Sequence, residues 1–206
     1  MNDIKPMDIE LESFEIITRE LGDRIIPPDH ELILKRVIHA SADFEYADNL
    51  KISDGAVACT LEAIRNGCDI VTDTQMVKSG INKTILTSLG GEVHCFMSDD
   101  DVAAEAKSRD TTRAIVSMEK AVKLEKPCIF AIGNAPTALI KIHELITQGI
   151  IKPVLVIGVP VGFVNVVEAK ELIMTADVPY IVAKGRKGGS NIAAAICNAL
   201  IYQVKR

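Results

Sequence analysis

Cys128-Ile-Phe-Ala-Ile132 decides the fold, because this unbroken apolar run leads through Gly133-Asn-Ala-Pro136 into a helical pattern that ends at Gly149. The same unit of strand, glycine-containing loop and helix follows twice more, with strands at Val154–Ile157 and Tyr180–Ala183 and helices at Val164–Met174 and Asn191 to about Gln203. Apolar strands without alternation, each followed by a helix, are typical of a parallel sheet that is buried on both faces.

The first half of the chain predicts further elements of the same kind, although its patterns are shorter. Apolar residues at helical spacing indicate a helix from Ile9 to about Leu21 and a second helix around Arg36. Short strands are expected at Leu50–Ile52, Cys68–Thr72 and Glu92–Met97, and Ser53 is expected to cap a helix that ends near Asn66. We therefore predict one domain over residues 1–206, a three-layer α/β/α, Rossmann-like fold with a mainly parallel sheet.

Composition argues against several classes of partner. A chain of 206 residues with 48% hydrophobic and 25% charged residues is ordinary for a soluble globular protein. A net charge of -5 disfavours a nucleic-acid partner, which would require a basic face. No apolar run reaches the roughly 18 residues of a membrane span, and the N-terminus lacks the pattern of a signal peptide. We expect a cytoplasmic protein with neither a nucleic-acid nor a membrane partner.

The cysteines give no sign of a metal or redox site. They are dispersed, and no pair has Cys-x-x-Cys spacing: Cys59, Cys68, Cys95, Cys128 and Cys197. A free cysteine in an apolar segment usually packs as a small hydrophobic residue. His39 and Asp43 have a spacing that could supply two ligands, but two residues do not make a metal site. We expect no metal bound by the protein.

Arg36 and His39 are the first candidates for chemistry. They lie three residues apart near the end of a predicted helix, so their side chains would occupy neighbouring positions on one face. A guanidinium beside an imidazole can hold an anion and donate a proton. The same two residues also fit a plain helix end, where basic side chains complement the negative end of the helix dipole. The local pattern leaves both interpretations open.

Three glycine-rich loops follow the three late strands and predict an anionic ligand. In a parallel sheet the carboxyl ends of the strands carry the ligand-binding loops, and glycine lets backbone N–H groups approach an anion closely. One such loop would be explained by turn conformation alone, but three in succession favour a ligand. The last loop adds the positive charges of Arg186 and Lys187. The glycines concerned are Gly133, Gly158, Gly162, Gly185, Gly188 and Gly189.

Common catalytic motifs are missing from the sequence. It contains no Gly-x-Gly-x-x-Gly and no Gly-x-x-x-x-Gly-Lys-Ser/Thr, so an enzyme that uses a nicotinamide or ATP is disfavoured. It also lacks the Gly-x-Ser-x-Gly turn of the α/β-hydrolases. His30, His94 and His143 fall at a helix start, in a strand and inside a helix, where structural roles are expected.

Five segments together resemble the precorrin-8X methylmutase family, which includes the cobalt-precorrin-8 methylmutases of the anaerobic cobalamin route. The resemblance covers nearly the whole chain, with the segments in the right order. They are Arg36-Val-Ile-His-Ala-Ser-Ala-Asp-Phe44, Met76–Ile81, Ala131–Leu139, Gly158–Val164 and Gly185–Ser190. One departure is Asn165-Val-Val167, where the family pattern leads us to expect smaller residues.

The resemblance implies an isomerase that moves a methyl group between neighbouring carbons in ring C of precorrin-8 or its cobalt form. The product would be hydrogenobyrinate or cobyrinate. It also implies a homodimer with the active site near the subunit interface. No cofactor is expected, and a cobalt ion would arrive inside the substrate. The alternative is a protein that holds a corrinoid without catalysis, using the same pocket.

The family resemblance assigns roles to individual residues. It implies that His39 donates and accepts the proton and that Ser13, Arg36, Gly80 and Arg113 contact the substrate, Arg113 by spacing alone. The acetate and propionate arms of a corrinoid are carboxylates, which explains why such a site would contain arginine and lysine. Arg186 and Lys187 are therefore added to the predicted substrate-binding residues.

Overall fold

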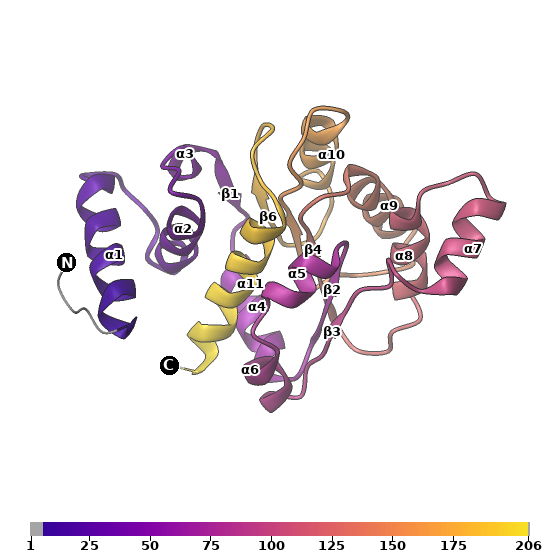
Figure 1. Ribbon diagram of the computed structural model, residues 1–206, viewed down its shortest axis with the longest axis horizontal. Coiled ribbons are helices and arrows are strands. Elements are labelled where there is room, and N and C mark those ends of the chain that lie inside the picture. The colour runs from indigo at the N-terminus through magenta and orange to yellow at the C-terminus, as the bar shows by residue number, and fades with distance from the viewer. Residues whose placement is uncertain (1–5, 206) are drawn as a thin grey trace.

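A computed structural model of the protein describes the backbone of residues 6–205 and the side chains of residues 9–204. In this part of the chain six strands form one sheet in the order β1-β6-β5-β4-β2-β3 (Figure 1). Strand β1 runs antiparallel to β6, and every other neighbouring pair is parallel. The strands span Leu50–Ile52 (β1), Asp69–Thr72 (β2), Val93–His94 (β3), Cys128–Ile132 (β4), Leu155–Gly158 (β5) and Tyr180–Ala183 (β6). The predicted mainly parallel sheet is confirmed.

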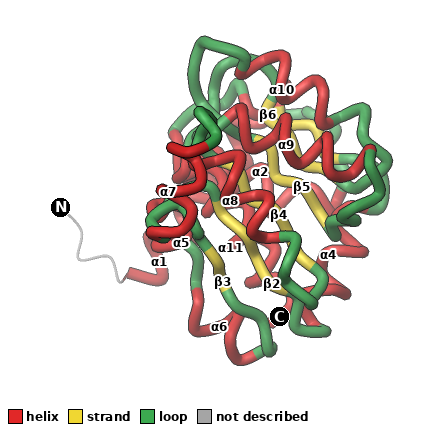
Figure 2. The backbone as a smooth tube through the Cα atoms, turned by 90° about the vertical axis from the view of Figure 1, so that its right-hand side faces the viewer, coloured by secondary structure: helices red, strands yellow, loops and turns green. Residues whose placement is uncertain are grey.

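Helices cover both faces of the sheet and complete the three layers predicted from the sequence (Figure 2). One face carries α1 (Pro6–Leu21), α2 (Pro28–Ser41), α3 (Tyr46–Asn49), α4 (Ala56–Arg65), α5 (Gln75–Gly80), α6 (Lys83–Ser88) and α11 (Ser190–Lys205). The other face carries α8 (Arg113–Ala121), α9 (Pro136–Thr147) and α10 (Val166–Ile173), while α7 (Asp100–Ser108) packs on α8. Figure 1 shows α1 and α7 at opposite ends of the molecule. Among the described helices, none has the length and apolar character to cross a lipid bilayer.

The buried strands alternate between two hydrophobic cores. In β4, Ile129 and Ala131 pack in the core beneath α11, whereas Cys128, Phe130 and Ile132 pack in the core beneath α9. Successive side chains of a strand point to opposite faces, so a strand with helices on both sides needs apolar residues at every position. This requirement explains the unbroken apolar runs in the sequence.

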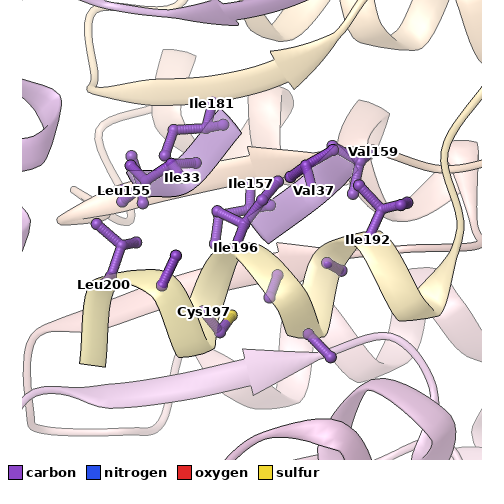
Figure 3. Packing of buried hydrophobic residues seen from close by; sticks show 14 of the residues in the cluster. Ile33, Val37, Leu155, Ile157, Val159, Ile181, Ile192, Ile196, Cys197 and Leu200 are labelled. Carbon is purple, nitrogen blue, oxygen red and sulfur yellow. The ribbon is translucent and has the colours of Figure 1, made fainter. Parts of the chain in front are cut away.

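The C-terminal helix α11 is the element around which the first face is built. Its Ile192, Ile196 and Leu200 are buried in one cluster with Ile157 of the sheet and Ile33 of α2 (Figure 3). Small buried residues occupy much of its remaining surface: Ala193, Ala194, Ala195 and Ala199. Because these side chains are short, α2, α4 and α5 can all pack closely against α11.

The strands and helices after residue 128 match the prediction to within about three residues. The first half differs more: the short helices α3 and α6 are not predicted, and two of the predictions made there are wrong. The strand expected at Glu92–Met97 is only Val93–His94: its pairing with β2 ends at His94, whose carbonyl lies 3.1 Å from the Thr72 hydroxyl oxygen. Ser53 does not cap α4. Its hydroxyl accepts the Tyr180 N–H at 2.9 Å, and Gly55 begins the helix instead.

Truncating the centre of α11 should destabilise the fold. Ile196 is fully buried, so we expect Ile196→Ala to lower the free energy of unfolding by about 2–5 kcal/mol through lost burial and a residual cavity. Urea unfolding followed by circular dichroism measures this change. The matched control is Ile25→Ala at a fully exposed position, where a change below about 0.5 kcal/mol is expected. Equal effects at the two positions would contradict the packing described for α11.

Candidate functional site

The last turn of α2 brings His39 to the surface. Ala42 adopts a left-handed conformation (φ 54°), and its N–H donates to the Ile38 carbonyl at 2.7 Å, which ends the helix. The exposed imidazole of His39 borders a hollow of about 210 Å³ between α1 and the end of α2, which we call the α1–α2 hollow. Its polar side chains are Ser13, Glu20 and His39, and its apolar ones include Ile16, Ile17, Ile38 and Phe44. Two residues predicted to act together, Ser13 and His39, therefore share one hollow.

Arg36 lies beside the α1–α2 hollow and is already held by protein groups. Its guanidinium carbon lies 5.4 Å from the centre of the Phe14 ring and 4.8 Å from that of the Tyr202 ring. Its Nη2 donates to Glu10 Oε1 at 2.5 Å, and its Nε is buried without a hydrogen-bond partner. Phe14 also contacts His39, with ring centroids 5.8 Å apart in an edge-to-face arrangement. Arg36 thus fixes the aromatic ring against which the imidazole rests.

The loop Gly185–Gly189 reaches the same end of α2. Lys187 Nζ lies 2.6 Å from Asp43 Oδ2 and 3.0 Å from Glu45 Oε2, just after the helix that carries His39. The hydrogen bond from Lys187 holds the pKa of Asp43 below its usual value, and the same bond raises the pKa of Lys187. Arg186 is exposed, with its guanidinium carbon 5.4 Å from the centre of the exposed Phe163 ring. The structure therefore brings both predicted basic loop residues to the carboxyl edge of the sheet.

Lys170 is not among the residues predicted from the sequence. It lies on α10 with its side chain fully buried, and its Nζ donates to the carbonyls of Gly185 and Lys187, both at 2.8 Å. Burial lowers the pKa of Lys170 to about 8. The sequence did contain a signal, since Lys170 comes four residues after Val166 and three before Ile173, on the apolar stripe of its helix.

Asp73 is a second missed residue. It follows β2 directly, is fully buried, and accepts the N–H groups of Gly133, Asn134 and Ala135 at 2.9, 2.8 and 2.6 Å. Burial raises the pKa of Asp73, and the three N–H groups oppose that rise. Its carboxylate thus shapes the loop between β4 and α9. An acidic residue directly after a buried strand is a signal that could have identified it.

Gly80 ends α5 where this helix crosses α11. A Cβ atom at this position would lie 2.8 Å from Ala194 Cβ, so the contact requires glycine. The Gly80 carbonyl accepts a hydrogen bond from Asn198 Nδ2 at 2.9 Å. The role visible for Gly80 is therefore close helix packing, and its predicted contact with substrate stays a prediction.

Arg113 is the one predicted site residue that lies on the opposite face of the sheet from His39. It is exposed at the first position of α8, on the face of the sheet opposite to α1 and α2. Thr112 caps this helix, and its hydroxyl oxygen lies 3.3 Å from that of Thr137 at the start of α9. No contact described for residues 9–204 connects Arg113 with His39, and its role stays a prediction.

The remaining histidines and cysteines do not form a second site of this kind. His94 Nε2 lies 3.0 Å from the buried carboxylate of Asp69 and stacks on Phe96, in agreement with the structural role expected for it. Within the described residues, no group of three or more His, Cys, Asp and Glu side chains is arranged to hold a metal ion. Four of the cysteines are buried and Cys59 is exposed, all as free thiols.

Comparison with known proteins identifies the family. A model of the precorrin-8X methylmutase family matches residues 8–203. The chain belongs to this family. The cobalt-precorrin-8 methylmutase of Priestia megaterium is 48% identical, over 96% of this chain and 88% of that protein. The precorrin-8X methylmutase of Pseudomonas aeruginosa is 39% identical, over 92% of this chain and 91% of that protein.

A solved structure leads to the same result. The precorrin-8x methyl mutase from Thermus thermophilus matches with a TM-score of 0.88 and 41% sequence identity, over 96% of this chain and 97% of that chain. The resemblance seen in the sequence motifs is therefore confirmed, and the protein is an isomerase of the methylmutase type in cobalamin biosynthesis.

The departure from the family pattern at Asn165 has a conformational explanation. Asn165 precedes α10 with φ 57°, in the left-handed region. Glycine adopts this conformation freely, and asparagine is among the few other residues that tolerate it. The turn before α10 is therefore available to asparagine as well as to the smaller residue expected.

A methyl group added at Gly80 should strain the contact between α5 and α11. We expect Gly80→Ala to lower the free energy of unfolding by about 1–3 kcal/mol, because overpacking exceeds the gain in helix propensity, at most about 1 kcal/mol. Adding Ala194→Gly should recover part of the loss, since it removes the opposing methyl group. Urea unfolding of the two single variants and the double variant gives the coupling. A Gly80→Ala variant as stable as wild type would contradict the packing role.

The burial of Lys170 predicts a dependence of stability on pH. Between pH 8 and the ordinary lysine value of 10.5, the unfolded chain binds more protons at Lys170 than the folded chain does. Raising the pH through this range therefore favours the folded state. Relative to Lys170→Met, the wild type should gain at most about 3 kcal/mol of unfolding free energy. Urea unfolding of both proteins at about pH 7 and about pH 10 tests this, and a difference independent of pH would contradict it.

Proposed function

We propose that this methylmutase moves a methyl group between neighbouring carbons of ring C in precorrin-8 or its cobalt form, with His39 as the proton donor and acceptor. The observation that carries the proposal is the position of His39 in the α1–α2 hollow, beside Ser13 and against the Phe14 ring. Among the four histidines, all with described side chains, only His39 is exposed. Relatives named for both forms of the substrate support the choice of a corrinoid.

The proposed chemistry needs little beyond a proton and a fixed substrate. In a sigmatropic methyl shift one carbon–carbon bond breaks as its neighbour forms, so no external electron carrier takes part. A proton delivered to the conjugated ring polarises it toward the shift, and the same group recovers that proton from the product. Histidine suits both steps because its two forms interconvert near neutral pH. The cobalt ion, when present, belongs to the substrate.

Basic side chains are proposed to bind the carboxylate arms of the macrocycle. Arg186 is the most available of them, since its guanidinium is exposed and its neighbour is the Phe163 ring. Lys187 lies next to it but already pairs with Asp43 and Glu45. Arg36 is enclosed by Glu10 and two aromatic rings, so we propose that it acts mainly by holding Phe14 against His39. Ser13, Gly80 and Arg113 complete the proposed contacts.

We further propose a homodimer, because one chain offers only part of a corrinoid site. The α1–α2 hollow has about 210 Å³, whereas pockets for drug-sized ligands reach roughly 300–1,000 Å³ and a corrinoid is larger. Helix α1, at the end of the molecule, exposes 51% of Ile9 and 38% of Ile16, which lie seven residues apart and therefore on one side of the helix (Figure 1). Apolar side chains grouped next to an incomplete site favour a second copy that supplies the missing wall.

Replacement of His39 separates catalysis from binding. We expect His39→Ala to lower turnover at least about 100-fold, the usual contribution of a general acid or base, while the corrinoid product still binds. Turnover is followed by the absorption change of the substrate, and binding by titration with product. The matched control is His143→Ala on α9, which should turn over normally. A His39→Ala variant with normal turnover would contradict the proposal. A wild-type protein that binds the corrinoid without turnover would favour the alternative of a protein that holds a corrinoid without catalysis.

Association of the chain can be measured directly. Sedimentation equilibrium should give twice the chain mass of 22.3 kDa. Ile9→Glu should weaken association, because it places a charge in the apolar surface of α1, whereas Ile25→Glu at the fully exposed position before α2 should not. A wild-type protein that stays monomeric at every concentration would contradict the dimer.

A further inference from the structure

Lys170 is a buried cation without a counter-charge. Its side chain is fully buried among the apolar residues of α10, and it forms no ion pair with any carboxylate among residues 9–204. Burying a charge in this way is costly unless hydrogen bonds compensate for the lost water. An apolar side chain of similar size would fill the same space without that cost. The ammonium group therefore has to be explained by what it contacts.

Its contacts fix one loop. Lys170 Nζ donates to the carbonyls of Gly185 and Lys187, each at 2.8 Å, and these two carbonyls flank Arg186. The Arg186 carbonyl in turn accepts the Gly162 N–H at 3.2 Å. Three consecutive carbonyls of the Gly185–Gly189 loop are thus held from the side of α10 and its preceding turn. Holding three carbonyls fixes the backbone from which the side chains of Arg186 and Lys187 project.

The same loop also contacts the segment that carries His39. Lys187 pairs with Asp43 and Glu45, and Asn191, just beyond the loop, donates from Nδ2 to the Ala40 carbonyl at 3.4 Å. A continuous set of contacts therefore runs from α10 through the loop to the end of α2. A change at Lys170 would therefore act directly on the backbone that positions the side chains of Arg186 and Lys187.

We propose that Lys170 is a positioning residue for corrinoid binding, which holds the Gly185–Gly189 loop so that Arg186 and Lys187 face the carboxylate arms of the macrocycle. The proposal rests on the function proposed above and adds a residue outside the α1–α2 hollow. Lys170 acts through the loop and contributes no proton to the methyl shift. Loss of the Lys170 ammonium group should therefore weaken corrinoid binding more than it slows the conversion of bound substrate.

The test compares Lys170→Met with Lys107→Met. Methionine keeps the buried stem of Lys170 and removes its donors, while Lys107 is an exposed lysine of α7 far from the loop in Figure 1. Each variant is examined by hydrogen–deuterium exchange of the 185–189 amides, by titration with corrinoid product, and by kcat and KM. For Lys170→Met we expect faster exchange confined mainly to the loop and product affinity weaker by about tenfold, the effect of losing one or two hydrogen bonds. KM should rise with kcat changed less than about threefold.

The outcomes separate this proposal from the proposed function. Unchanged loop exchange in Lys170→Met overturns the positioning role, and so does faster exchange with unchanged product affinity. A loss of kcat at unchanged affinity also overturns it, because that would place Lys170 in the chemical step. Failure of the wild type to turn over either substrate form would instead overturn the proposed function. Should Lys170→Met not fold, Lys170→Gln keeps two N–H donors on a shorter stem, and intermediate loop exchange and affinity are expected.

Discussion

The packing of α11 against the sheet is the constraint on which the rest of the structure depends. Its large apolar side chains seal the core, and its alanines let α2, α4 and α5 approach. Its polar residues then organise the neighbouring segments. Tyr202 stacks on Arg36, Asn198 binds the end of α5, and the Ser190 hydroxyl lies 2.9 Å from that of Thr74. Because α2 is placed by α11, so is His39 at its end.

Two buried charges of opposite sign shape the carboxyl edge of the sheet. Asp73 accepts hydrogen bonds from three backbone N–H groups of the loop after β4. Lys170 donates to two backbone carbonyls of the loop after β6. Glycine-rich loops are flexible by composition, because glycine has access to more backbone conformations than other residues. A buried charge with several backbone partners restricts that freedom without adding bulk. Rigid loops around a large ligand lose less entropy when it binds.

The sequence predicted the architecture better than the site. Strands such as Cys128–Ile132 are apolar at every position, and this pattern can be recognised without knowing which segments pack against the strand. The site depends on contacts between distant segments. Arg36 was predicted to face substrate, but Glu10 and Tyr202, at opposite ends of the chain, enclose it. Gly80 was predicted from a motif, and only the approach of Ala194 reveals its packing role. Asp73 and Lys170 stand out by their positions, directly after a buried strand and on an apolar helix stripe, but their partners are backbone groups of distant loops, which the sequence does not identify.

A proton donated by His39, as we propose, requires ring C of the macrocycle to lie at the α1–α2 hollow and to face His39. The most direct measurement is a crystal structure of the protein with its corrinoid product bound. We expect an imidazole nitrogen of His39 within about 3.5 Å of ring C, a distance suited to proton transfer, with carboxylate arms near Arg186. A macrocycle bound elsewhere on the protein, or one whose ring C points away from His39, would contradict it.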